Sequence, residues 1–100
     1  MQEKRSYRIG YDHAFQIALN SAKICFNVKE QNINEGYMKC TTKASLWSWG
    51  ENVLIRIISI NSTQTEISVE SSASAQLFDW GKSKDNIDLF FNTLEQNIGW

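Results

Sequence analysis

The sequence predicts a two-layer α+β domain in which two helices flank a four-stranded antiparallel sheet along the chain and both cover one face of it. Three observations support this prediction. An apolar, β-branched run at residues 53–60 is typical of an inner strand. Helical stripes of apolar residues occupy residues 11–23 and 80–98. Three further segments alternate apolar and polar residues, as half-buried strands do: 23–31, 37–43 and 65–71.

Length and composition indicate a single domain over residues 1–100. The chain is 42% hydrophobic, which is enough for one core. Ten basic and eleven acidic residues give a formal charge of −1, which weighs against a partner such as nucleic acid or an anionic membrane. No run reaches the roughly 18 apolar residues of a membrane span, and the first residues lack the apolar segment of a secretory signal. We therefore expect a cytoplasmic protein without a membrane span.

The few cysteine and histidine residues limit the chemistry that the chain can carry. Cys25 and Cys40 both fall in predicted strands, on opposite faces by strand parity, so a disulfide between them is not expected. Unpaired thiols fit a reducing compartment. His13 is the single histidine, and no cysteine pair has metal-binding spacing. We therefore predict no metal site and no cofactor.

The first helix is predicted at residues 11–23. Before it, residues 1–10 form either an N-terminal arm or an edge strand, because Tyr7 and Ile9 are apolar at period two. Asp12 suits the positive end of the helix dipole. The apolar stripe consists of Tyr11, Phe15, Ala18, Leu19 and Ala22.

The next two strands are predicted to form a hairpin. Asn34 and Gly36 both tolerate a positive φ, which suits a short turn at residues 32–36. Strand parity then directs one set of side chains to the core: Ile24, Phe26 and Val28 from the first strand, with Met38, Cys40 and Thr42 from the second.

The central strand and its neighbour complete the predicted sheet. Val53, Ile55 and Ile57 point to the core, as do Ile67 and Val69. Arg56 points outward, as do Glu66, Ser68 and Glu70. We expect Arg56 to lie opposite a glutamate of the neighbouring strand, in a pair worth about 0.2–1 kcal/mol.

The closing helix has two candidate N-caps, Asp79 and, one turn later, Ser83. Gly99 suits the C′ position at its end. Leu89 falls on the opposite side from the apolar stripe, and we expect it to be exposed. The stripe consists of Trp80, Lys84, Ile87, Phe91, Leu94 and Ile98, and Phe90 widens it.

Two segments together resemble the signatures of a family of uncharacterised bacterial α+β domains. One is residues 45–57, SLWSWGENVLIRI; the other is residues 68–87, with Asp79-Trp80-Gly81 and then Ile87. The resemblance extends over roughly residues 11–98 and implies the fold, while the family brings no activity with it. The chain has Ala75, Gln76 and Ser83 at positions where the family pattern has other polar residues, so a family ligand site at those positions is not carried over.

The aromatic connections suggest a small non-enzymatic binding or protein-interaction module. Trp47 and Trp49 precede the central strand, and Phe78 and Trp80 precede the closing helix. If both connections meet at one end of the sheet, they line a groove for a small molecule or a protein; the plainer alternative is a hydrophobic plug that closes the core. The predicted ligand-binding residues are Trp47, Trp49, Phe78, Asp79, Trp80 and Lys82.

An enzyme with a site at the start of the closing helix is the alternative function, using Asp79, Lys82 and Ser83. Gly81-Lys82-Ser83 lacks the glycine spacing of a phosphate loop, although backbone N–H groups there would suit a weak anion site. Asp79 has the simpler explanation of a helix cap. No set of nucleophile, base and orienting group is evident, so no catalytic residue is predicted.

The outward face of the sheet is mixed. Leu54 and Ile58 would allow a weak homodimer of an otherwise monomeric protein. Its basic residues and Tyr37 follow the pattern of single-strand nucleic-acid binders, but Glu66 and Glu70 oppose a polyanion there. Nucleic acid is therefore not the expected partner. The basic residues are Lys29, Lys39, Lys43 and Arg56.

Overall fold

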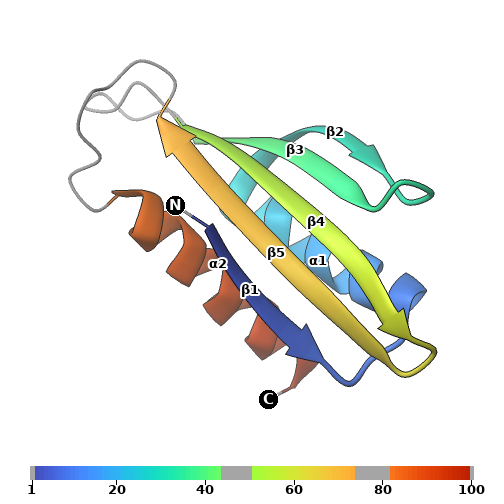
Figure 1. Cartoon of the computed structure of the whole chain (residues 1–100). Helices are drawn as coiled ribbons and strands as arrows, with labels where there is room; N and C mark the ends of the chain where they lie inside the picture. The colour runs from blue at the N-terminus through green and yellow to red at the C-terminus, as the bar shows by residue number, and fades with distance from the viewer. Residues whose placement is uncertain (1, 44–50, 74–81, 100) are drawn as a thin grey trace.

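The fold of the chain is taken from a computed structural model, which describes residues 2–43, 51–73 and 82–99. Along the chain, one strand and one helix precede four strands and a closing helix (Figure 1). The elements are β1 (Gln2–Tyr7), α1 (Tyr11–Cys25), β2 (Phe26–Asn32), β3 (Tyr37–Thr42), β4 (Glu51–Asn61), β5 (Gln64–Ala73) and α2 (Lys82–Ile98).

The strands form one five-stranded sheet in the order β1-β5-β4-β3-β2, and every neighbouring pair is antiparallel. The predicted run at 53–60 lies in β4, the central strand. The N-terminal segment is an edge strand, since Gln2 to Tyr7 pair with β5 from Glu70 to Thr65. Of the two alternatives for the first residues, the edge strand is therefore correct.

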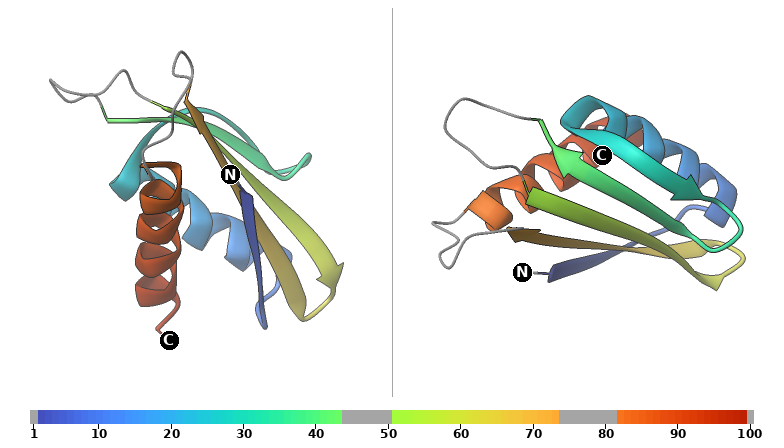
Figure 2. Two further views of the ribbon diagram at one scale, coloured as in Figure 1. Left: turned by 60° about the vertical axis from the view of Figure 1, so that its left-hand side comes forward. Right: turned by 90° about the horizontal axis from the view of Figure 1, so that it is seen from above.

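Both helices cover the same face of the sheet, as predicted (Figure 2). α1 packs on β2, β3, β4 and β5, while α2 packs on β5 and on α1. The core between the layers takes large side chains from every layer, all at most 1% exposed: Phe15, Met38, Ile55, Ile67, Phe90, Phe91 and Leu94. The predicted α+β fold with both helices on one face is confirmed. Neither of the helices described is long and apolar enough to cross a membrane.

The boundary between α1 and β2 differs from the prediction. Residues 23–25 continue the helix, so Ile24 is 59% exposed instead of facing the core. Cys25 belongs to the helix, not to a strand, and is buried, with its Sγ 3.3 Å from Thr93 Oγ1 of α2. That contact between helices favours the extra helical residues, and Phe26 N–H then caps the end of α1 at Ala22 O. Cys25 and Cys40 are both free thiols.

The inward positions of β4 and β5 are as predicted, but one pairing across the two strands is not. Val53, Ile55 and Ile57 are buried, and Ile55 and Ile57 pair with Val69 and Ile67. Arg56 lies opposite Ser68 instead of a glutamate, because Glu66 and Glu70 pair with Ile58 and Leu54. The expected Arg56–glutamate pair was therefore wrong.

The closing helix confirms most of its predicted stripe. Ile87, Phe90, Phe91 and Leu94 are buried, and Leu89 is 48% exposed on the opposite side. Gly99 has a φ of +90° and its N–H donates to Glu95 O at 3.1 Å, as a C′ residue does.

The structure describes the position of one of the two predicted N-caps of α2, Ser83, and not that of the other, Asp79. α2 begins at Lys82, which places Ser83 inside the first turn, so its prediction as an N-cap was wrong. Asp79 and Trp80 lie outside the described residues, so their predicted roles as cap and stripe residue remain predictions.

Candidate functional site

One end of the sheet gathers the residues that border the two connections 44–50 and 74–81. Glu51, the first residue of β4, pairs with Ala73, the last residue of β5. Glu51 N–H also donates to Thr42 Oγ1, the last residue of β3, at 2.8 Å. We call this end of the sheet, where α2 also begins, the loop end (Figure 1).

Most of the ligand-binding residues predicted from the sequence belong to those connections. Lys82 opens α2, and only its backbone is described. The others lie outside the described residues, so the aromatic groove remains a prediction: Trp47, Trp49, Phe78, Asp79 and Trp80.

A buried carboxylate marks the described part of the loop end. Glu51 is 7% exposed, and its Oε2 accepts hydrogen bonds from Ser71 Oγ at 2.8 Å and from Asn86 Nδ2 at 3.1 Å. These three residues, the Glu51 cluster, come from β4, β5 and α2. Burial of a carboxylate costs free energy unless donors surround it, and the cluster supplies donors from both layers. The cluster therefore joins the sheet to the first turns of α2 by polar contacts.

Strand parity explains why these side chains meet. Glu51 is two residues before Val53 and so shares its inward direction, and Ser71 follows Val69 in the same way. Glu51 precedes the apolar run at residues 53–60 that marks the central strand in the sequence, so the cluster was not predicted. Extending the period-two pattern of the central strand by one step would have found it.

Aromatic side chains adjoin the Glu51 cluster inside the interface. Phe90 follows Asn86 by one helical turn and is fully buried. Its ring stacks on that of Phe26, with the ring centroids 6.2 Å apart, and meets Phe91 edge to face at 5.6 Å. Phe26 pairs across strands with Thr42, whose hydroxyl accepts from Glu51 N–H. An apolar aromatic set thus lies next to a small polar set at the loop end.

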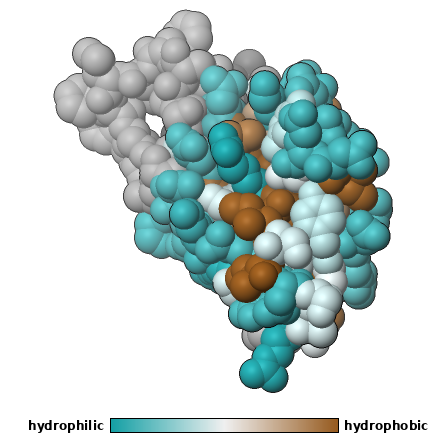
Figure 3. Space-filling model, turned by 45° about the vertical axis from the view of Figure 1, so that its right-hand side comes forward, coloured by the Kyte–Doolittle hydropathy of each residue, from teal (hydrophilic) through white to brown (hydrophobic). Residues whose placement is uncertain are grey.

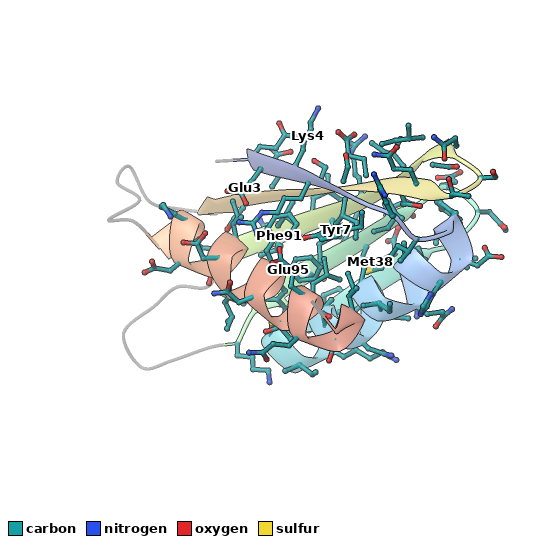
Figure 4. The ribbon with its side chains drawn as sticks, turned by 90° about the horizontal axis from the view of Figure 1, so that it is seen from below. Glu3, Lys4, Tyr7, Met38, Phe91 and Glu95 are labelled. Atoms are coloured by element: carbon teal, nitrogen blue, oxygen red, sulfur yellow. The ribbon has the colours of Figure 1, made fainter. Side chains whose placement is uncertain are left out.

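A second polar cluster lies between β1 and α2 and is held by interactions within the chain. Glu95 Oε2 accepts from Arg5 Nη1 at 2.6 Å and from Tyr7 Oη at 2.9 Å. Figure 4 shows Tyr7, Phe91 and Glu95 together between strand and helix, with Lys4 directed away from them. Burial and the Glu95 carboxylate raise the pKa of the Tyr7 phenol, so Tyr7 stays a donor. This arrangement holds the edge strand on the helix. Arg5, Tyr7 and Glu95 serve as hydrogen-bond partners for one another.

Nucleophilic or metal chemistry finds no support among the described residues. Burial raises the pKa of the Cys40 thiol to about 11, which disfavours a reactive thiolate. His13 is exposed on α1. Within residues 2–43, 51–73 and 82–99, no group of three or more His, Cys, Asp or Glu side chains is placed to hold a metal ion.

Comparison with known proteins shows similarity in fold without similarity in sequence. No protein-family model and no curated protein matches the chain. The resemblance of residues 45–57 and 68–87 to a bacterial family is therefore not supported by a match in sequence. The di-domain ARO/CYC StfQ from the steffimycin biosynthetic pathway superposes with a TM-score of 0.59 and 6% identity, over 94% of this chain and 43% of StfQ. This chain therefore spans less than half the length of StfQ.

A second solved structure matches over nearly its whole length. A conserved protein from Geobacillus kaustophilus superposes with a TM-score of 0.51 and 11% identity, over 98% of this chain and 93% of that protein. Identities this low show the fold alone. The fold of this chain is accordingly helix-grip-like, an antiparallel sheet with two helices packed on one face.

Proposed function

We propose that this chain is a binding module for a small, largely apolar molecule, held at the loop end between α2 and the sheet. In this proposal the polar group of the ligand is directed to the Glu51 cluster, and its apolar part contacts the connections 44–50 and 74–81, because the aromatic set around Phe26 and Phe90 is itself buried. The observation that carries the proposal is the buried Glu51 carboxylate, hydrogen-bonded from both layers beside that aromatic set.

The free-energy cost of burying the Glu51 carboxylate supports a role for the cluster beyond stability. Apolar residues of similar volume often replace buried charged groups with no loss of stability, so a buried carboxylate is weak evidence for a structural role. Binding sites for small molecules typically combine a mainly apolar lining with a few polar groups that orient the ligand. The loop end has this composition. The predicted aromatic residues Trp47, Trp49, Phe78 and Trp80 belong to connections that border it, so they would extend the apolar lining.

Ligand screening by NMR tests the proposal. A library of small apolar metabolites is titrated into the ¹⁵N-labelled protein, and we expect shifts at Glu51, Ser71 and Asn86 and at the tryptophan indole N–H groups. Glu51→Gln keeps the shape and removes the charge, so it should weaken binding roughly tenfold. Asp12→Asn, at an exposed carboxylate in the first turn of α1, is the control and should bind like the wild type.

Two results would contradict this proposal. One is a screen in which no compound shifts the Glu51 cluster or the indole groups. The other is a ligand that binds Glu51→Gln as tightly as the wild type, because the cluster would then have a purely structural role.

The enzyme alternative keeps one supporting observation. α2 begins at Lys82, so Lys82 and Ser83 lie within about one turn of Asn86 in the Glu51 cluster. This alternative predicts that Asp79→Asn abolishes an activity while the fold stays intact. If the substitution only lowers the free energy of unfolding by about 1 kcal/mol, helix capping is the sufficient explanation.

A further inference from the structure

Two adjoining hollows lie on the outer face of the sheet, the face turned away from both helices. One has a volume of about 380 Å³ and the other about 410 Å³, within the range of small-molecule sites. Lys39 and Leu54 line both, so the two form one continuous surface, which we call the outer hollow. Figure 3 shows apolar side chains gathered among polar ones on this side of the molecule. Its floor is apolar at Leu54 and at Ile58, which is 42% exposed.

Three cationic side chains from neighbouring strands surround Leu54 in the outer hollow. Lys39 of β3 pairs with Leu54 of β4, and Tyr37 pairs with Arg56, so Lys39 and Arg56 are diagonal neighbours within reach of one group. Lys29 of β2 lies beside Glu30, which pairs with Lys39. The register of the strands therefore concentrates positive charge over an apolar floor.

These cations are weakly compensated within the described chain. Lys39 approaches Glu30 only at 4.0 Å, between exposed side chains. Neither Lys29 nor Arg56 has an ion pair with any residue in the described part of the chain. Lys43, which the sequence placed with them, instead donates to Ile24 O at 3.1 Å. Weakly compensated cations on neighbouring strands favour a bound anion.

The carboxylates of the outer hollow limit the size of that anion. Glu70 lines one part of the hollow and Glu35 the other, so the positive charge is confined to the stretch between them. An extended polyanion such as single-stranded nucleic acid or an acidic peptide would run past one of these carboxylates and be repelled. A ligand with a single anionic group avoids both.

We propose that the outer hollow binds a small amphipathic anion. Its anionic group lies between Lys39 and Arg56, and its aliphatic or aromatic body lies along Leu54 and Ile58 beside the Tyr37 ring. This site is separate from the one proposed at the loop end, because Leu54 and Glu51 point to opposite faces of β4.

The test compares 4-phenylbutyrate with 4-phenylbutanol, which share a body and differ in charge, by ¹H–¹⁵N NMR titration of the whole chain. We expect the butyrate to shift the amides of Lys39, Leu54, Arg56 and Ile58, and the alcohol to shift them far less. Arg56→Gln should raise the Kd for the butyrate roughly three- to fivefold, and added salt should raise it in the wild type. Lys4→Gln changes an exposed cation on the same face outside the hollow, so it should leave the Kd unchanged.

Several results would overturn this site. Equal shifts with the alcohol would show that binding depends on apolar contact alone. An unchanged Kd in both Arg56→Gln and Lys39→Gln would show that these cations do not contribute to binding. A thymidine octanucleotide that binds the hollow more tightly than the butyrate would show a polyanion surface. Glu51→Gln separates the two proposals, since it should weaken binding at the loop end and leave the outer hollow unaffected.

Discussion

Arg5 of the first strand donates to Glu95 of the last helix, with 2.6 Å between Nη1 and Oε2. The same guanidinium lies over the Phe91 ring, 4.5 Å from its centroid, and its Nε donates to Glu3 at 2.7 Å. Among the described strands β1 pairs only with β5, and its contacts on the helix side come from α2. Arg5 thus joins β1 to α2 through its contacts with the Phe91 ring and the Glu95 carboxylate, while Glu3 holds the guanidinium from within β1.

Glu95→Gln should weaken this joint at neutral pH. Glu95 accepts from both Tyr7 and Arg5, and hydrogen bonds to a charged group contribute more than neutral ones. Because both Arg5 and Glu95 are about one-third exposed, solvent reduces the gain, and we expect a loss of about 1 kcal/mol in the free energy of unfolding. Urea denaturation at pH 7 measures the loss. Glu70→Gln, which removes an exposed carboxylate, is the control.

The contribution of Glu95 should also depend on pH. The hydrogen bond from Tyr7, with Arg5 adding to it, lowers the pKa of Glu95 below its ordinary 4.5. A carboxylate with a lowered pKa in the folded state stabilises the fold above its unfolded pKa and loses that effect as the pH falls through the folded value. The difference between wild type and Glu95→Gln should therefore be full at pH 7 and shrink below about pH 4.5. A difference that stays constant down to pH 3 would contradict this account.

Gly36→Ala should be strongly destabilising, because Gly36 meets two constraints at once. Its φ is +73°, and an added Cβ would collide with Ile57 O and lie 2.7 Å from the Tyr11 hydroxyl. Neither neighbour moves freely, since Ile57 N–H donates to Gly36 O at 2.8 Å and the Tyr11 hydroxyl donates to Ile33 O at 2.6 Å. We expect a loss of roughly 2–4 kcal/mol, from the positive φ and from overpacking together.

Gly99→Ala is the matched control for that substitution. Gly99 also has a positive φ, +90°, but nothing lies within 4 Å of an added Cβ. Only the backbone cost applies, so we expect a loss of about 1 kcal/mol. Equal losses in the two variants, measured by urea denaturation, would show that the contacts at Gly36 contribute nothing.

Periodicity made most of the fold predictable. A period of two placed Val53, Ile55 and Ile57 in the core, and a period of 3.6 placed Phe91 and Leu94 there, because these patterns follow from backbone geometry alone. Ile24 was misplaced because it continues the alternation of Phe26 and Val28 backwards, whereas the helix runs on to Cys25, where the contact of the thiol with α2 favours it. Such long-range contacts leave no local signal.

The candidate sites were less predictable for a related reason. The inward direction of Glu51 follows from strand parity, but its meeting with Asn86 depends on where α2 lies across the sheet. The pairing of Arg56 with Ser68 depends on the register between two strands, which alternation alone does not determine. Strand register and helix docking join residues far apart in the chain, so a site built from them becomes visible only in the folded structure.

Leu94→Ala and Leu89→Ala should separate the buried and exposed sides of α2. Leu94 is fully buried and Leu89 is 48% exposed on the same helix, so helix propensity changes equally in the two variants. We expect Leu94→Ala to cost about 2–5 kcal/mol, from lost burial and a cavity, and Leu89→Ala about 0.5 kcal/mol or less. Urea denaturation of both variants measures the difference. A Leu89→Ala loss near that of Leu94→Ala would mean that Leu89 is covered in solution.

The Cys40 thiol should resist alkylation in the folded protein. Cys40 is 3% exposed, and burial raises the pKa of its thiol from 9.0 to about 11. Because the thiolate is the reactive species, at pH 8 this shift alone lowers the reactive fraction roughly a hundredfold, and burial slows access further. Labelling with iodoacetamide, followed by peptide mass spectrometry, measures the rate at Cys40 in native protein and in guanidinium, where the ordinary pKa applies.

The pH dependence of that rate distinguishes reaction in the folded state from reaction after opening. If the thiol reacts in place, the native rate at Cys40 should rise about tenfold per pH unit from pH 8 to pH 10, because its pKa lies near 11. If it reacts only after the sheet opens, the rate should level off near pH 9, like that of the unfolded chain. A native rate at pH 8 equal to the rate in guanidinium would contradict the burial of Cys40 between the helices and the sheet.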